Sequence, residues 1–177
     1  MAIISSGKPT TLKEVQLRLG VPQHILIHLC EKGVIEPDFA DTSGRGRHRE
    51  FSDRNLFEFG VALALRKLEI PVATTAFVIR LLRSFERATK KALPSFEIPA
   101  VLVDDGLELG LDLYDGQFIV FSARGGKLRR PLLLRAIADP AHDPTARPRV
   151  ELLDELPRSY DARLQVDLTR IARRVLG

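Results

Sequence analysis

Positive charge is concentrated in a short glycine-containing segment of this 177-residue chain. Residues 43–51 read Ser-Gly-Arg-Gly-Arg-His-Arg-Glu-Phe, which brings Arg45, Arg47, His48 and Arg49 close together in the sequence. Glycine allows a loop to follow a surface closely, and guanidinium groups form paired hydrogen bonds with phosphate oxygens. The segment therefore predicts a loop that contacts a polyanion, and the neighbouring sequence favours duplex DNA as that polyanion.

Two helical patterns precede this basic segment. Thr11 and Glu14 have the spacing of a capping box, and the apolar stripe that follows them ends at Gly20. Pro22 restarts the chain, because proline is favoured at the start of a helix, and residues 23–32 predict a second helix. A helix, a tight turn and a second helix make a helix-turn-helix. The DNA-contacting residues predicted on this pair of helices are Thr11, Lys13, Gln23, His24 and His28.

The sequence after the second helix is typical of a wing. Residues 34–37 predict a short strand, residues 38–46 a polar loop and residues 47–51 a returning strand. Alternation would place Arg47, Arg49 and Phe51 on one face of that strand, with Phe51 anchoring it to the core. The DNA-contacting residues predicted on the wing are Arg45, Arg47, His48 and Arg49. Ser52 or Asp53 is then a good N-cap for a helix over residues 54–68.

Residues 11–82 resemble the DNA-binding domain of the MerR family, the bacterial mercury-resistance-type transcription regulators. The matching elements follow one another in the expected order: Gly20-Val21 at the turn, Glu-Lys-Gly-Val-Ile-Glu-Pro at 31–37, Arg-Glu-Phe-Ser at 49–52, Asn55-Leu56, and Leu-Glu-Ile-Pro-Val at 68–72. The resemblance implies a dimer that binds duplex DNA. It also implies that Arg49 approaches the phosphate backbone, with Phe51 where the family usually has tyrosine.

The second helix departs from the family pattern. The family usually carries an arginine and aromatic residues in the middle of this helix, whereas residues 25–30 read Ile-Leu-Ile-His-Leu-Cys. Two alternatives to a sequence-specific regulator therefore stay open. One is an architectural or recombination-accessory DNA binder that mainly contacts the backbone. The other is a winged-helix module that binds proteins.

A long helix is predicted after the wing, over residues 73–93. Phe77, Leu81 and Phe85 form an apolar stripe at helical spacing. The resemblance implies that this helix takes part in dimerisation, so we expect the stripe to form the seam of a homodimer or to lie next to it. The alternative is that the stripe packs against the C-terminal part of the same chain. The opposite face of the helix is basic and is predicted to be solvated, with Arg80, Arg83, Arg87, Lys90 and Lys91.

Residues 95–177 predict a small α+β module. Leucines alternate with polar residues over 107–113, and Asp115-Gly116 is a strong hairpin turn before a strand at 117–122. Residues 132–138 are ambiguous between strand and helix, 138–148 predict a proline-rich loop, and 150–153 and 164–166 predict strands. A basic helix follows to the end of the chain. Alternation places Glu108 and Asp112 on one strand face, which we expect to be wet.

Composition narrows the functional class. Residues 1–92 carry 15 Lys/Arg against 10 Asp/Glu, whereas residues 93–177 carry 12 against 13, so the positive excess lies in the half with the helix-turn-helix pattern. The single cysteine, Cys30, is expected to pack rather than react, and no metal site, cofactor or catalytic constellation is expected. No apolar run is long enough to span a membrane, and no signal peptide is recognisable, so we expect a cytoplasmic protein and no membrane partner.

The predicted fold class is α+β. A winged helix-turn-helix over residues 8–72 precedes a linking and dimerisation helix over 73–93, and an interaction or effector module with an antiparallel hairpin covers 95–177. The expected activity is DNA binding rather than catalysis. The C-terminal module is expected to contact a protein partner or an effector that the sequence does not identify.

Overall fold

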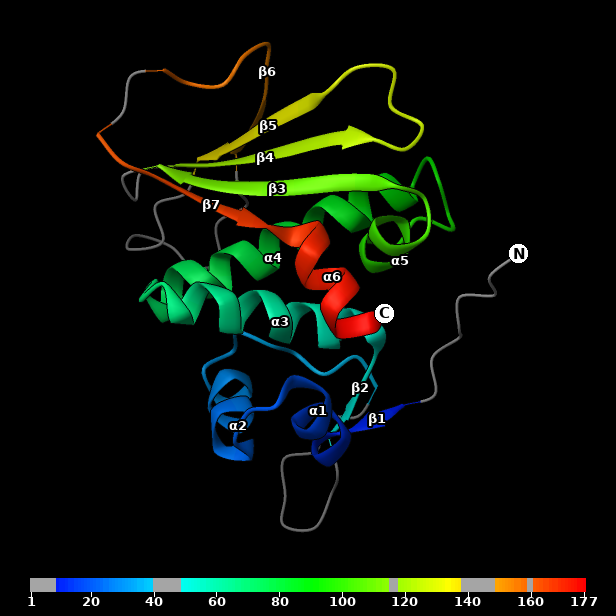
Figure 1. The fold of residues 1–177 in the computed structure, drawn as a ribbon, viewed down its shortest axis with the longest axis vertical. Helices are drawn as coiled ribbons and strands as arrows, with labels where there is room; N and C mark the ends of the chain where they lie inside the picture. Colours follow the sequence, from blue (N-terminus) through cyan, green and yellow to red (C-terminus); the bar gives the residue numbers. More distant parts are fainter. Residues whose placement is uncertain (1–8, 40–48, 115–117, 138–148, 159–160) are drawn as a thin grey trace.

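The computed structural model describes residues 9–39, 49–114, 118–137, 149–158 and 161–177. Its described part is a mixed α and β structure in which helices cover one face of an antiparallel sheet (Figure 1). The helices α3 (Asp53–Lys67), α4 (Val72–Lys90), α5 (Ile98–Val103) and α6 (Leu168–Leu176) form the middle layer. The pair α1 (Leu12–Leu19) and α2 (Gln23–Glu31) lies on the side of α3 away from the sheet.

The sheet contains the strands β3 (Leu107–Tyr114), β4 (Phe118–Gly125), β5 (Leu132–Ile137), β6 (Arg149–Leu153) and β7 (Arg163–Asp167). Their order across the sheet is β6-β5-β4-β3-β7, and every neighbouring pair is antiparallel. The predicted hairpin is confirmed, because Leu107 pairs with Gly125 and Tyr114 with Phe118. Its Asp115-Gly116 turn and the predicted loop at 138–148 lie outside the described residues. The segment that was ambiguous between strand and helix forms the strand β5 over Leu132–Ile137.

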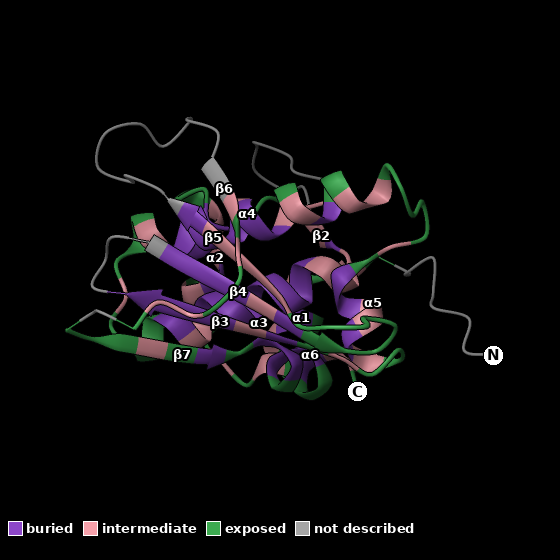
Figure 2. Cartoon of the chain, turned by 90° about the horizontal axis from the view of Figure 1, so that it is seen from above, coloured by how far each residue is buried: buried purple, intermediate pink, exposed green. Residues whose placement is uncertain are grey.

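The leucine face of the sheet packs on the helices. Leu82 and Phe85 of α4 surround a small apolar space together with Leu109, Phe121 and Leu134 of the sheet. Seen from above, the central strands are largely buried and the edges are more exposed (Figure 2). The alternation of leucines therefore fixed which face of the sheet turns inward.

The opposite face of β3 corrects one expectation. Glu108 is exposed as predicted, but Asp112 is 0% exposed. Asp112 accepts a hydrogen bond of 2.9 Å from Nε of Arg163 on the neighbouring strand β7. Alternation assigns a residue to a face, but it does not say whether that face is wet, and here an arginine on the next strand pairs with the carboxylate.

The central helix is α3, whose residues from Asn55 to Ala62 are all buried. Gly60 lies against α6 so closely that a Cβ atom there would come within 2.8 Å of Ile171 and 2.9 Å of Val175. The first helix of the chain's second half, α5, was not predicted from the sequence. One hydrophobic cluster joins residues of the predicted winged domain, the linking helix and the C-terminal module, so the three segments pack as one body.

Candidate nucleic-acid interface

Local signals in the sequence position α1 and α2. The predicted capping box is present, because Thr11 accepts from the backbone N–H of Glu14 while the Glu14 carboxylate accepts from Thr11. Gly20 ends α1 with a φ of 63°, a left-handed conformation that glycine adopts without steric cost. Val15, Leu26 and Leu29 are buried in the core cluster and hold the pair on the rest of the molecule. The two helices predicted before the basic segment are therefore present.

The residues predicted to contact DNA from these helices occupy different environments. Lys13 of α1 and Gln23 and His24 of α2 are exposed, whereas His28 is half-buried. The side chain of Thr11 is exposed but is engaged in the cap through Glu14. Gln23 and His24 at the start of α2 therefore offer the polar side chains most open to a ligand on this helix.

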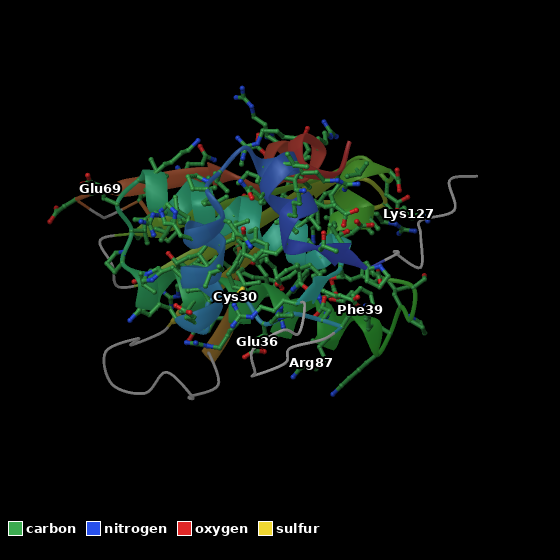
Figure 3. The ribbon with its side chains drawn as sticks, turned by 90° about the horizontal axis from the view of Figure 1, so that it is seen from below. Cys30, Glu36, Phe39, Glu69, Arg87 and Lys127 are labelled. Carbon is green, nitrogen blue, oxygen red and sulfur yellow. The ribbon has the colours of Figure 1, made fainter. Side chains whose placement is uncertain are left out.

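The apolar middle of α2 is largely turned inward. Ile25 and Ile27 are half-buried, and Cys30 packs against the core cluster, as expected for a structural cysteine. In the view from the side of α1 and α2, Cys30, Glu36 and Phe39 lie near the middle of the picture (Figure 3). The apolar residues that depart from the family pattern thus serve packing to a large extent.

The returning strand of the predicted wing is present but has a different partner. Strand β2 (Glu50–Phe51) pairs with β1 (Thr10–Thr11), directly before α1. Phe51 is fully buried and meets Phe59 of α3 edge to face, with ring centroids 5.3 Å apart. The prediction that Phe51 anchors this segment is confirmed. Arg49 is half-buried beside the strand, while Arg45, Arg47 and His48 lie outside the described residues.

The predicted strand at residues 34–37 is wrong. Val34 and Ile35 are buried, and side chains rather than a neighbouring strand satisfy the backbone that follows. The carbonyl of Glu36 accepts hydrogen bonds from Asn55 Nδ2 at 2.9 Å and from Arg83 Nη2 at 2.7 Å. Buried backbone groups need partners, and here α3 and α4 supply them.

The two ends of the segment that contains the predicted wing meet at Asn55 of α3. Its Oδ1 accepts from the backbone N–H of Asp38 at 2.9 Å and from that of Ser52 at 3.3 Å. The Ser52 hydroxyl, which caps α3, also donates to the carboxylate of Asp38. We call Asp38, Ser52 and Asn55 the wing base, because they hold together the residues on either side of 39–51.

Two arginines connect the wing base to α4. Arg54 donates to Asp38 through Nη2 at 2.6 Å and through Nε at 3.0 Å, and its Nη1 donates to Glu86 at 3.1 Å. Arg83 forms a two-pronged pair with Glu58, with both N···O distances at 2.6 Å. Glu58 and Glu86 are 1% and 2% exposed. We refer to these four residues together with the wing base as the polar network.

The environment shifts the proton affinity of these groups in opposite directions. Burial raises the pKa of Asp38, but hydrogen bonds from Arg54 and Ser52 outweigh it and hold the pKa below the usual 3.8. Burial also raises the pKa of Glu58, and there the hydrogen bonds from Arg83 only partly oppose the shift. For Arg54, burial lowers the pKa, but the hydrogen bond and the charge of Asp38 outweigh burial, so the pKa lies above its ordinary value. Asp38 and Arg54 thus stabilise each other's charged forms.

The long helix α4 departs from two expectations. Phe77 and Leu81 are 6% and 4% exposed, and Phe85 packs edge to face on Phe96 with centroids 6.0 Å apart. The stripe is therefore covered by its own chain, as the alternative interpretation held, and it is not an open dimer seam. The predicted solvated face is wrong at Arg83, whose side chain is 16% exposed, although Arg87 and Lys91 are exposed.

The polar network was not found from the sequence, and only part of it could have been. Ser52 and Asn55 carried a signal, because a polar cap followed three residues later by a short amide side chain is a capping box, and the structure has one there. Asp38, Glu58, Arg83 and Glu86 are common surface residue types whose pairing depends on how α4 crosses α3. Their spacing along the chain carries no such information.

The described residues offer little support for other kinds of site. They contain no group of three or more His, Cys, Asp or Glu residues arranged to hold a metal ion. Among the same residues, none of the helices has both the length and the apolar character needed to cross a bilayer. The exposed polar residues at the start of α2, Gln23 and His24, are the candidates for contact with a ligand. No protein-family model matches the chain, and no curated protein sequence does either.

Proposed function

We propose that the chain is a DNA-binding transcriptional regulator of the MerR type, and that it binds duplex DNA through α2 and the basic segment 43–49. The observation that carries the proposal is the wing base. It holds Asp38 and Ser52 together through Asn55, so the residues that flank the arginine-rich segment meet at one place, and β2 then pairs with β1 directly before α1. A basic loop beside a helix-turn-helix suits the phosphate backbone.

The roles of individual residues follow from their positions. Arg45, Arg47, His48 and Arg49 would contact phosphates, and Lys13 of α1 is exposed for the same purpose. Gln23 and His24 would face the major groove from the start of α2, where side chains can donate to or accept from base edges. Binding as a homodimer is part of the proposal, because two half-sites require two copies. Its interface is not the buried stripe on α4.

An architectural DNA binder is the second candidate. It is favoured by the inward-facing middle of α2, which leaves few polar side chains for reading bases. Both candidates predict phosphate contacts, and they differ in the affinity gap between a selected sequence and a scrambled one. A winged module that binds proteins would show neither property.

The decisive experiment is a salt titration of DNA affinity. Fluorescence anisotropy would compare a duplex selected from a random pool with its scrambled version. A regulator gives a large gap, an architectural binder gives a steep salt dependence without the gap, and absence of binding at low salt contradicts DNA binding altogether.

Wing variants sharpen the same experiment. Arg47→Ala and Arg49→Ala should each weaken binding to all sequences alike and reduce the slope of log K against log salt by about one. Arg158→Ala is the matched control, since this arginine is 84% exposed and its ion pair with Glu155 is local in the chain. Wild-type affinity in both wing variants would show that the wing is not on the DNA.

A further inference from the structure

The wing base is connected to the beginning of α5 by an uninterrupted series of polar contacts. Asp38 binds Arg54, Arg54 binds Glu86, and the second oxygen of Glu86 accepts from the backbone N–H of Ile98 at 2.9 Å. Ile98 begins α5, and α5 packs against α6 and β3. One guanidinium and one carboxylate thus span the distance between the winged segment and the sheet module.

The geometry leaves these groups few other partners. Glu86 is 2% exposed and reaches Arg54 and Lys90 with one oxygen and Ile98 with the other. Arg54 uses Nε and Nη2 for Asp38 and Nη1 for Glu86. A planar guanidinium presents its donors at fixed angles, so a movement of one carboxylate reorients the donors aimed at the other.

We propose that Arg54 and Glu86 are positioning residues that set the placement of the wing base according to the position of α5. Loss of the Glu86 charge frees the Arg54 guanidinium, which weakens its hold on Asp38 and loosens the ends of the segment 39–51. A ligand or partner that shifts α5 would act on the wing through the same contacts. The consequence for DNA rests on the function proposed above, whereas the mechanical link does not.

Hydrogen–deuterium exchange of the full-length free protein tests the link directly. Glu86→Gln keeps the shape of the side chain and removes its charge. We expect the amides of Asp38 and Ser52 to exchange about tenfold faster, which corresponds to a loss of about 1.4 kcal/mol in local stability. The amides of Leu111 and Val120 in the centre of the sheet report global unfolding and should not change in proportion.

A matched substitution and a reciprocal one complete the design. Glu97→Gln makes the same chemical change one residue before Ile98. Glu97 is 55% exposed, and it pairs at 3.4 Å with Lys90, which also contacts Glu86, but among the described residues it has no ion pair or hydrogen bond with Arg54, so the wing base should exchange nearly as in the wild type. Asp38→Asn should in turn accelerate exchange at the Ile98 amide. If Glu86→Gln fails to fold, this reciprocal effect still shows whether the wing base and α5 are linked.

The possible results separate cleanly. The link is supported if Glu86→Gln accelerates exchange at the wing base without accelerating it in the sheet, and if Asp38→Asn accelerates exchange of the Ile98 amide. It is also supported if the double variant, which carries Glu86→Gln and Asp38→Asn, exchanges no faster than the faster single variant. Equal acceleration in the sheet, an effect confined to α5, or multiplied effects in the double variant would overturn it.

DNA affinity is the second readout. If the wild type binds DNA, Glu86→Gln should weaken binding about three- to tenfold while Glu97→Gln does not, and unchanged affinity contradicts a role of the link in DNA binding. If the wild type does not bind DNA, the proposed function fails while the exchange experiment still decides the link.

Discussion

The two sides of α3 are held by different chemistry. On one side, Gly60 lets the apolar residues Ile171 and Val175 of α6 approach to van der Waals distance. On the other, Arg54, Asn55 and Glu58 form directional hydrogen bonds with α4 and with the residues that flank the wing. The apolar contact depends on volume and fixes how near α6 lies. The polar contacts depend on charge and angle, and they fix how the wing base is oriented.

This difference explains how one helix can serve two partners. Apolar packing stabilises without specifying direction, so this contact joins α6, which follows the last strand of the sheet, firmly to α3. Buried ion pairs contribute less net stability, because the charges must leave water, but they tolerate few alternative arrangements. Substitutions on the two sides of α3 should therefore differ in how much they lower the free energy of unfolding and in whether they change the wing base.

The largest effect is expected for Glu58→Ala on the polar side. The substitution leaves Arg83, which is 16% exposed, without its two-pronged partner, and Asn55 loses an acceptor. Removing one member of a buried pair costs about 3–5 kcal/mol, so the free energy of unfolding measured in urea should fall by that order. The exposed Glu108→Ala is the control and should stay within about 0.5 kcal/mol of the wild type. Similar losses for both variants would contradict the role of the buried pair.

A smaller loss is expected for Gly60→Ala on the apolar side. The new methyl group would lie 2.8 Å from Ile171 and 2.9 Å from Val175, and such overpacking costs about 1–3 kcal/mol. The better helix propensity of alanine offsets up to about 1 kcal/mol of this. We expect a net loss of about 1–2 kcal/mol in urea unfolding.

The rescue variant identifies the cause of that loss. Val175→Ala removes one of the two clashing methyl groups, while that of Ile171 remains, so the double variant should lose somewhat less stability than the two single variants added together. Strict additivity would mean that α6 does not limit residue 60.

Two N-cap residues, one on the polar side of α3 and one on α6, allow a comparison of two substitutions that should lower the free energy of unfolding equally. Ser52 caps α3 at the wing base, and Asp167 caps α6 with a hydrogen bond of 2.8 Å from the Arg170 N–H. Replacing either with alanine should cost about 1 kcal/mol. Only Ser52→Ala should also accelerate hydrogen exchange at Asp38, because the Ser52 hydroxyl donates to that carboxylate. Equal exchange at Asp38 in the two variants would contradict a special role of the wing base.

The sequence predicted local structure better than contacts between distant segments. Thr11, Gly20 and Ser52 act on their own turn of chain, and each has the predicted cap or turn function. The leucines of β3 define their own face by alternation, and that face is indeed turned inward. Such signals depend only on neighbours within a few residues, so a single sequence carries them.

What the sequence could not predict depends on how α4 crosses α3. That crossing buries Phe77 and Leu81 and turns Arg83 from a surface residue into the partner of Glu58. An apolar stripe has the same spacing whether its own chain or a second copy covers it. The helices of the candidate interface were accordingly predictable, whereas the polar network was not, and the contacts predicted for the basic residues stay a prediction.

The smallest effect is the pH dependence of the free energy of unfolding that comes from the Asp38 carboxylate. The pKa of this carboxylate is held below 3.8 in the folded protein, so the folded state keeps it ionised at a pH where the unfolded chain takes up the proton. Its contribution is therefore fully present above about pH 3.8 and is lost as the pH falls from there through the folded pKa. Urea unfolding of the wild type and of Asp38→Asn should differ most near neutral pH, and the difference should shrink towards pH ~3. A difference that stays constant from neutral pH into acid would mean that the Asp38–Arg54 contact does not stabilise the charged carboxylate, and the polar side of α3 would then owe its stability to shape rather than to charge.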